Sequence, residues 1–368
     1  MRIREIIFNN VRAFRGEHRI SFVDQLTDQA SPISVIAGTN GTGKTTILET
    51  IQELLRAFIN HKLTQHLLLT EISQSSDHFI QMVLELSPAD LGVSVGSSVE
   101  YINIFVGNVP ESTYQETPHY FGFRQNAILA SDSGSQLRGF LNDKHNDMLN
   151  GSAEPRGGLI YFPQTRLPFS PSIKGGPVES QPQHFEWLSQ VDSPNQWKGS
   201  LEALWVWQNY LDLEAGAKNG GGYNNHINLR PFIESSEEAL SRQREITILK
   251  GRVLVQTNWQ NNGEAAWVRL DQLPSGEQQL LFLLGELTRR CRPGGIIAID
   301  EPETSLHPTM QRRLVHEVRK FARTWDCQVI LATHSLEVLR EVHQSARIFL
   351  DLLNRPAKAS RPQLQEAA

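Results

Sequence analysis

Residues 37–46 of the chain read AGTNGTGKTT, and this stretch decides the fold. It follows the apolar, β-branched run ISVIA (33–37), which predicts a buried strand. It runs into TTILETIQELLRAF (45–58), whose apolar residues recur with the period of a helix. A strand, a glycine-rich loop and a helix in this order predict a phosphate-binding loop, because the N-terminus of the helix attracts an anion.

The loop matches the pattern G-x-x-x-x-G-K-[ST]. Its glycines allow the positive φ angles that turn several backbone N–H groups towards one anion. We expect Lys44 to reach the β- and γ-phosphates of a nucleotide and the Thr45 hydroxyl to hold Mg²⁺. A plain turn between a strand and a helix is the alternative, which the complete strand–loop–helix context disfavours. The residues that we expect to contact nucleotide here are Gly38, Asn40, Gly41, Gly43, Lys44, Thr45 and Thr46.

The composition limits the classes of protein to consider. The 368 residues allow two domains or one large α/β domain with insertions, and 39% hydrophobic residues support an ordinary packed core. A net charge of −5 gives no overall field that attracts nucleic acid, so DNA binding would need a local patch or a partner. The two cysteines, Cys291 and Cys327, exclude a disulfide framework and a cysteine-based zinc site, and they suit a reducing cytosol.

The sequence also predicts the compartment. It shows no signal-peptide pattern and no run of about 18 apolar residues that could span a membrane. We therefore expect a cytoplasmic protein with no membrane partner. The twelve histidines show no spacing typical of metal ligands.

The order of the predicted elements indicates the architecture. Apolar runs at 78–87 and 99–107 predict strands, which we assign to an N-terminal antiparallel β portion. From residue 275 onward helices and strands alternate, which predicts a mostly parallel sheet with crossover helices. We expect an α/β fold with a discontinuous nucleotide-binding core (1–166 and 269–352), an inserted, mainly helical lobe (167–268) and a disordered tail (353–368).

A second motif, GGIIAIDEPETSLHP (294–308), ends an apolar strand in two adjacent acids. Ligands of open parallel sheets bind at the carboxyl ends of the strands, where these acids are expected to lie. We assign Asp300 to holding Mg²⁺ through water and Glu301 to polarising the attacking water. An acidic surface loop is the alternative, and the phosphate-binding loop upstream argues against it.

Two further stretches complete the set. In PSGEQQLL (274–281), Ser275 and Gly276 open a long apolar helix, whose N-terminus forms an anion site through its N–H groups and dipole. In QVILATHSLEVL (328–339), a buried strand ends at Thr333 and His334. A single histidine after a strand is usually structural, but in this chain order His334 is a candidate for contacting the γ-phosphate.

The order of a phosphate loop, an S-G-E signature, a D-E pair and a histidine resembles the ABC-type ATPases. Within them the chain looks most like the RecF/SMC/OLD-related soluble branch, an AAA family ATPase without a fused nuclease domain. IREIIFNNVRAFRG (3–16) resembles the opening strand and turn of that branch, SGEQQLL (275–281) its signature, and DEPETSLHP (300–308) its acidic strand and D-loop. The resemblance covers roughly residues 1–60, 157–166 and 268–351, and it implies a P-loop ATPase head that uses ATP and Mg²⁺.

The resemblance also implies how the head works. Family members close two heads around two nucleotides, which implies a homodimer or a higher homo-oligomer in which Ser275, Gly276 and Glu277 contact the nucleotide of the other chain. Gln164, in YFPQTR (161–166), corresponds to the residue that links Mg²⁺ to the inserted lobe, a solvated loop glutamine being the alternative. Pro274 departs from the signature, which usually has serine there, so a hydroxyl contact depends on Ser275 while the helix N-terminus is unaffected.

The expected function is a head whose ATP-gated dimerisation drives or regulates a partner effector, such as a separate nuclease, in genome defence or DNA repair. The nucleotide-binding subunit of an ABC transporter is the alternative, although 231 residues between Lys44 and Ser275 are long for a transporter head. A nuclease within the chain is disfavoured, since 34 residues follow His334 and no D-x-D pair occurs. A scaffold that binds nucleotide without hydrolysis is disfavoured by the acidic pair.

The inserted lobe is the expected surface for a partner. Its tryptophans, Trp187, Trp197, Trp205 and Trp207, form either a hydrophobic core or a stacking platform for nucleic acid, and the absence of an interleaved Lys/Arg run favours a core. Residues 217–230 have the composition of a flexible loop. The basic helix 310–323 is either a solvated face or a DNA patch, and the net charge makes a protein the favoured partner over DNA.

Overall fold

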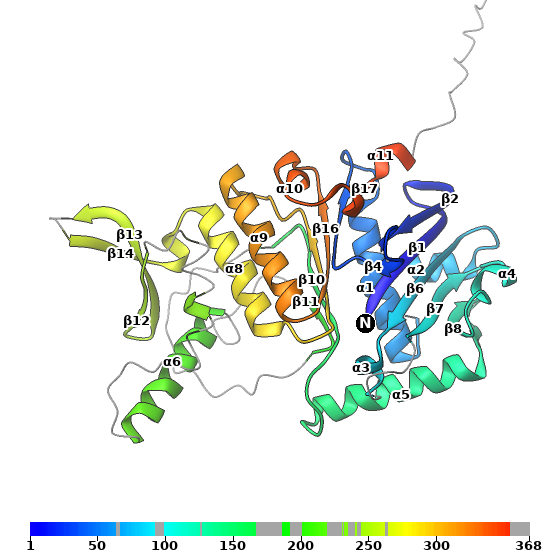
Figure 1. Ribbon diagram of the computed structural model, residues 1–368, viewed down its shortest axis with the longest axis horizontal. Coiled ribbons are helices and arrows are strands. Elements are labelled where there is room, and N and C mark those ends of the chain that lie inside the picture. Colours follow the sequence, from blue (N-terminus) through cyan, green and yellow to red (C-terminus); the bar gives the residue numbers. More distant parts are fainter. Residues whose placement is uncertain are drawn as a thin grey trace, which may run out of the picture.

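The computed structural model describes residues 1–63, 67–92, 99–125, 127–166, 186–191, 201–218, 230, 232–234, 240, 244–261 and 264–353 (Figure 1). Two six-stranded sheets form the body of the protein, and a three-stranded sheet lies in the inserted segment. The tail expected at 353–368 lies outside the described residues from 354 onward, as do most of the loop expected at 217–230 and Trp197.

The N-terminal sheet has the strand order β2-β1-β6-β7-β8-β9. Its neighbours pair antiparallel except for β7 and β8, which are parallel, so the expected antiparallel portion is confirmed. The strands at 78–87 and 99–107 are present as β6 and β7. The strand bounds are β1 (Arg2–Val11), β2 (Phe14–Ser21), β6 (Phe79–Leu86), β7 (Glu100–Gly107), β8 (His119–Arg124) and β9 (Ala127–Ala130).

The second sheet is parallel throughout, with the order β11-β10-β15-β16-β5-β17. Its central strands β15 and β16 are buried along their whole length, as their apolar sequences predict. The register pairs Asp300 with Ala332 and Thr333 with Ala37, so β15, β16 and β5 end at one edge. The strand bounds are β11 (Leu188–Gln190), β10 (Leu159–Phe162), β15 (Ile296–Asp300), β16 (Gln328–Thr333), β5 (Ile33–Ala37) and β17 (Arg347–Phe349).

Helix α1 (Lys44–Asn60) lies between the two sheets (Figure 1). Its apolar residues share one core with β1 and with alternate residues of the parallel sheet, such as Ala298 and Ile330. The intervening strand residues point to the opposite face, where α8 (Ser275–Arg290) and α9 (Pro308–Thr324) cover them. The phosphate loop therefore joins a buried strand to a buried helix and is supported on both sides.

Several smaller elements complete the core. Residues 108–157 contain α4 (Glu111–Tyr114), β8, β9 and α5 (Asp132–Leu149). Helix α5 packs against β8 but is mostly polar, which explains why its apolar period is weak. The other short elements are β3 (Val23–Asp24), β4 (Gln29–Ala30), α2 (Leu67–Gln74), α3 (Pro88–Leu91), α10 (Leu336–Arg340) and α11 (Leu350–Leu353).

The described part of the inserted segment is mixed rather than mainly helical. It contains one long helix, α6 (Leu201–Lys218), and an antiparallel sheet of β12 (Ile246–Leu249), β13 (Arg252–Asn261) and β14 (Glu264–Arg269). The sequence predicts strands in ITILKGRVLVQTN (246–258) and AAWVRLDQL (265–273), and these strands are present, so the expectation of a mainly helical lobe is wrong for the described part. Strand β11 lies beyond residue 166, where the first part of the nucleotide-binding core was expected to end. It nevertheless pairs with β10 and extends the parallel sheet of that core.

The tryptophans of this segment belong largely to cores. Trp205 is fully buried and packs with Leu281 of α8, so it ties the segment to the nucleotide-binding core. Trp187 is buried in the core around α1, and Trp207 stacks on Tyr210. For Trp187 and Trp205, burial excludes a stacking platform for nucleic acid. Within the described residues, no helix combines the length and the hydropathy required to cross a bilayer.

Candidate functional site

The phosphate loop has the shape of an anion cradle. Gly41 and Gly43 have φ angles of +83° and +102°, a region that favours glycine. A Cβ at Gly43 would also lie 2.7 Å from the Phe14 ring, so no larger residue fits there. Helix α1 begins at Lys44, and no side chain caps its N-terminus. Its first N–H groups are therefore available to an anion.

The loop faces a cleft with a volume of about 460 Å³. Most of the residues expected to bind nucleotide line it, and Gln164 and Glu301 line its other side. Arg12 and Ala13, from the turn after β1, also line the cleft and were not predicted. The complete lining is Arg12, Ala13, Asn40, Gly41, Gly43, Lys44, Thr45, Thr46, Gln164 and Glu301.

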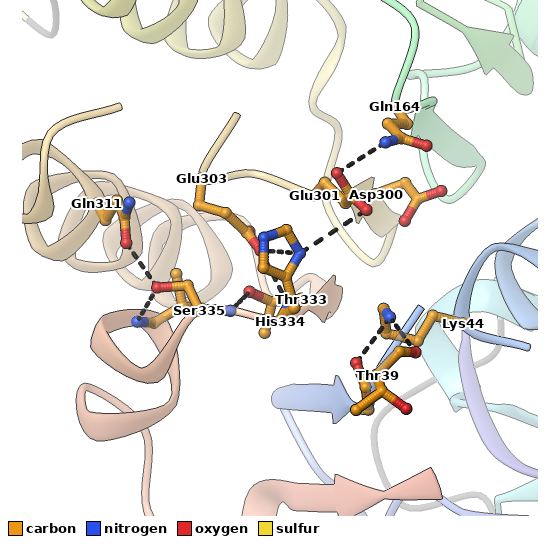
Figure 2. Close-up of polar contacts among 12 residues, drawn as sticks. Thr39, Lys44, Gln164, Asp300, Glu301, Glu303, Gln311, Thr333, His334 and Ser335 are labelled. Atoms are coloured by element: carbon orange, nitrogen blue, oxygen red, sulfur yellow. Dashed lines mark hydrogen bonds and ion pairs between the residues drawn. The ribbon is translucent and has the colours of Figure 1, made fainter. Parts of the chain in front are cut away.

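Lys44 is buried at the base of the loop. Its Nζ donates to the carbonyl oxygens of Gly38 at 2.8 Å and Thr39 at 3.0 Å (Figure 2). Gly38 thus contacts the lysine rather than the cleft. Thr39 is anchored in turn by Asp351 of α11, whose carboxylate accepts from the Thr39 hydroxyl at 2.7 Å and from its N–H at 3.1 Å. Sequence reasoning missed Asp351, which lies 312 residues from Thr39.

Asp300 lies at the end of β15, next to the cleft-lining residues Thr45 and Glu301. It is fully buried, and its Oδ2 accepts a hydrogen bond from the Thr45 hydroxyl at 2.6 Å. Its Oδ1 is buried and has no hydrogen-bond partner among the described residues. Burial raises the pKa of Asp300, and the nearby Glu301 charge raises it further, while the Thr45 hydrogen bond opposes the shift.

These oxygen donors fit a Mg²⁺ ion. Thr45 and Asp300 are hard ligands, and the unpaired Oδ1 is a buried acceptor that a cation or its water would satisfy. The described residues contain no cluster of three or more His, Cys, Asp or Glu side chains that could hold a metal. Mg²⁺ in nucleotide sites is typically held by one or two protein oxygens together with substrate phosphates and water, so two donors suffice.

Glu301 follows Asp300 and lies on the cleft wall. Its backbone is left-handed, with φ of +45°, which is uncommon outside glycine. Its Oε2 accepts from Gln164 Nε2 at 2.8 Å, and its Oε1 lies 3.8 Å from His334 Nδ1 (Figure 2). The structure therefore brings Gln164, Glu301 and His334 together, and Gln164, which was expected to link to Mg²⁺, donates to the carboxylate of Glu301.

His334 is held at the end of β16 by Glu303. The carboxylate of Glu303 accepts from the His334 backbone N–H at 2.9 Å and lies 3.2 Å from its Nδ1 (Figure 2). Glu303 is buried, whereas the His334 side chain is 52% exposed. Sequence reasoning missed Glu303, although it lies within the DEPETSLHP motif. Ser335 caps α10 and donates to Gln311 of α9 at 2.6 Å, which fixes the backbone that follows His334.

Arg166 is another residue that sequence reasoning missed. Its buried guanidinium donates to the carbonyl oxygens of Pro163 at 2.8 Å, Asp300 at 2.6 Å and Glu301 at 2.8 Å. Burial lowers the pKa of Arg166 to about 10, so the side chain stays charged at neutral pH.

The signature residues lie apart from the cleft. Ser275 is exposed at the start of α8, Gly276 is buried, and Glu277 forms an ion pair with Arg244; none of the three lines the cleft. A Cβ at Gly276 would lie 2.7 Å from the carbonyl oxygen of Ser305, so the glycine allows α8 to pack against the loop after β15. Pro274 is at the N-cap and gives no side-chain cap, which leaves the N-terminus of α8 open.

Two protein-family models match the chain, one over the phosphate loop and the other over the remaining motifs. The family model described as AAA domain, putative AbiEii toxin, Type IV TA system matches residues 140–340, more than half of the chain. The chain belongs to this family. The matched part of this AAA protein includes Gln164, the signature, the acidic pair and His334. A second model, described as AAA domain, matches residues 5–82, which include the phosphate loop.

Curated relatives of this AAA protein match a short part of it. The phosphonates import ATP-binding proteins PhnC of Lactobacillus johnsonii, Lactobacillus gasseri and Lactobacillus delbrueckii subsp. bulgaricus are each 32% identical over 78 residues. The match covers 21% of this chain and 30%, 29% and 29% of those proteins. The chain therefore spans less than a third of the length of these relatives.

Solved structures of SMC head domains are similar over most of the chain. One is an SMC head bound to the C-winged helix domain of ScpA, with a TM-score of 0.49 and 12% identity. Another is the SMC head domain from Thermotoga maritima, with a TM-score of 0.42 and 12% identity. Each match covers 93% of this chain and 92% of that chain. The fold of this chain is defined by the strand order of its two six-stranded sheets.

Proposed function

We propose that this AAA protein binds and hydrolyses ATP with Mg²⁺ in the cleft between its phosphate loop and its acidic pair. The single observation that supports this most strongly is the hydrogen bond between Thr45 and Asp300. It joins two motifs 255 residues apart in the sequence at one cleft. Lys44, Thr45 and Glu301 line one space large enough for the phosphates of a nucleotide, and Asp300 is hydrogen-bonded to that Thr45.

The side chains suggest how the work is divided. Lys44 exchanges its carbonyl partners for the β- and γ-phosphates, and the N-terminus of α1 adds N–H donors. Thr45 and Asp300 hold the Mg²⁺ ion, which neutralises charge that develops on the phosphates. Glu301 polarises the attacking water once its carboxylate leaves the Gln164 amide. With Nδ1 held by Glu303, the Nε2 atom of His334 is the ring nitrogen left for the γ-phosphate.

Steady-state ATP hydrolysis tests this proposal. Glu301→Gln keeps the shape of the side chain but removes the base, so turnover is expected to fall about 100-fold or more while nucleotide still binds. Lys44→Ala is expected to weaken nucleotide binding itself. Glu111→Gln, on the exposed surface of α4, is the matched control and should hydrolyse ATP at the wild-type rate. Wild-type turnover by Glu301→Gln would show that Glu301 is not the base.

We further propose that ATP binding joins two heads in a homodimer or a higher homo-oligomer. Ser275, Gly276 and Glu277 form a helix N-terminus outside the cleft, and Ser275 is exposed to a second copy. Such a surface suits contact with the nucleotide of the partner across a symmetric interface. Glu301→Gln with ATP should trap the dimer in solution at micromolar concentration, and Ser275→Arg should prevent trapping. A monomeric mass under all conditions would contradict the proposal.

The closed heads are proposed to regulate a partner effector, such as a separate nuclease, in genome defence or DNA repair in the cytoplasm. The family description, which names an AbiEii toxin and a Type IV TA system, supports a defence role. The test is co-purification with the product of an adjacent effector gene, with and without ATP. ATP-independent binding, or no binding to any adjacent gene product, would argue against ATP-gated control.

A transporter subunit remains the second candidate, because the three curated relatives are named as phosphonate import ATP-binding proteins. A gene for a multi-span membrane protein beside this one, and ATP-dependent binding to its product, would favour transport. Direct DNA binding is expected to be weak at a net charge of −5 and to fall steeply with salt.

A further inference from the structure

Arg166 makes an unusual set of contacts for a buried arginine. Its side chain is buried, and its hydrogen bonds to described residues end on the carbonyl oxygens of Pro163, Asp300 and Glu301. With the amide of Gln279 oriented to accept, that side chain on α8 lies 2.6 Å from Arg166 Nε. Moving a charged guanidinium from water into the protein interior costs free energy. The contacts of Arg166 with the backbone carbonyls of the acidic pair therefore call for a reason beyond packing.

The backbone of Glu301 supplies that reason. A non-glycine residue at φ of +45° is in an uncommon, strained conformation that the surroundings must maintain. Arg166 donates to the carbonyl before this residue and to its own carbonyl, so one planar group fixes both peptide units. The Glu301 N–H donates to the Ala332 carbonyl at 2.8 Å, and the Glu301 carbonyl also accepts from the Thr304 N–H at 3.1 Å. These two hydrogen bonds further restrict the Glu301 backbone.

The segment that carries Arg166 also carries Gln164. Gln164 Nε2 donates to the Glu301 carboxylate at 2.8 Å, and the N–H of Arg166 donates to the Gln164 carbonyl at 3.1 Å. The segment 163–166 therefore contacts the Glu301 side chain through Gln164 and the Glu301 backbone through Arg166. They directly follow β10, which pairs with β15 in register, so the sheet places this segment beside the acidic pair.

We propose that Arg166 is a positioning residue for ATP hydrolysis, which holds the left-handed backbone of Glu301 so that its carboxylate faces the cleft. Arg166 does not line the cleft and so acts through Glu301, without contacting the nucleotide. The inference rests on the proposed ATPase function. It predicts that loss of Arg166 impairs turnover far more than nucleotide binding.

The experiment compares Arg166→Met and Arg166→Lys with the control Arg4→Met in the full chain. Arg4 lies on β1, is half-buried and forms ion pairs with Asp28 and Glu85. Arg4→Met therefore also removes charge-assisted contacts, but Arg4 does not line the cleft. For Arg166→Met, kcat should fall roughly 10- to 100-fold, since a misplacement of about 1 Å has effects of this size. KM for ATP and the Kd for ADP should stay within about twofold. Arg166→Lys should retain an intermediate kcat, and Arg4→Met the wild-type kcat.

The same substitution in a Glu301→Gln background separates positioning from general structural damage. If Arg166 acts through Glu301, the residual rate of Glu301→Gln should change less than about twofold when Arg166→Met is added. An equal fold loss in both backgrounds, wild-type kcat in Arg166→Met, or a loss of ADP binding matching the loss of kcat would each overturn the proposal. If Arg166→Met does not fold, Arg166→Lys is compared in the wild-type and Glu301→Gln backgrounds in the same way. Wild-type hydrolysis by Glu301→Gln alone would instead refute the proposed role of Glu301.

Discussion

Gln328 joins the two six-stranded sheets, and its replacement by leucine predicts a large loss of stability. The residue is fully buried at the start of β16. Its Oε1 accepts from the N–H of Ile3 at 2.7 Å, and its Nε2 donates to the carbonyl of Ile3 at 2.8 Å. Both sides of one peptide segment of β1 are therefore satisfied by a single amide from the parallel sheet.

The magnitude follows from these two contacts. Gln328→Leu leaves a buried N–H and a buried carbonyl without their partner, and each such group costs about 1–3 kcal/mol. The leucine has a similar volume and returns about 1 kcal/mol through its apolar surface. The expected loss is therefore about 1–5 kcal/mol in the free energy of unfolding.

Urea unfolding followed by tryptophan fluorescence and by far-UV circular dichroism measures this loss. Coincident transitions are needed for a single free energy of unfolding. Gln115→Leu is the matched control, because Gln115 donates to Glu111 at an exposed site and its loss should change stability by less than about 0.5 kcal/mol. A Gln328→Leu protein as stable as the Gln115→Leu control would refute the account of how the sheets are joined.

Three further outcomes are expected. Asp351→Ala removes the anchor of Thr39 at an exposed site, so the Kd for ADP measured by calorimetry should rise about fivefold, roughly 1 kcal/mol; an unchanged Kd would contradict this. Trp205→Ala should lower the free energy of unfolding by about 3–5 kcal/mol in urea titrations, whereas Trp267→Ala, 40% exposed, should lower it much less. Because burial raises the pKa of Asp300, Mg²⁺ affinity in the presence of ADP should weaken on acidification at a higher pH than for an exposed aspartate. Asp300→Asn should flatten this titration.

The parts of the site that sequence predicts best are those with strict local geometry. The loop 37–46 needs glycines at positive φ next to a strand and a helix, and the structure has all three. Strands 295–300 and 328–333 are buried on both faces, so their apolar runs identify them without ambiguity. Their order along the chain then brings Lys44, Asp300 and His334 to one edge of the sheet.

The parts that sequence could not predict depend on contacts between distant segments. Arg166 and Asp351 have no local pattern, and their roles appear only when β10 pairs with β15 and when β17 pairs with β5. Strand β11 is three residues long, too short for a periodic signal. In the inserted lobe, the runs 246–258 and 265–273 predict strands, but their pairing into the sheet β12–β14 is a contact that spacing alone does not show.

The most direct test of the ATP hydrolysis site is a single-turnover measurement with Glu301→Gln in excess over labelled ATP. Nucleotide binding and phosphate release are followed in the same samples and compared with wild type. We predict that Glu301→Gln binds the ATP and holds it uncleaved, with phosphate release slowed about 100-fold or more. Bound ATP that is cleaved at the wild-type rate would contradict the assignment of Glu301, and with it the proposed chemistry of the cleft.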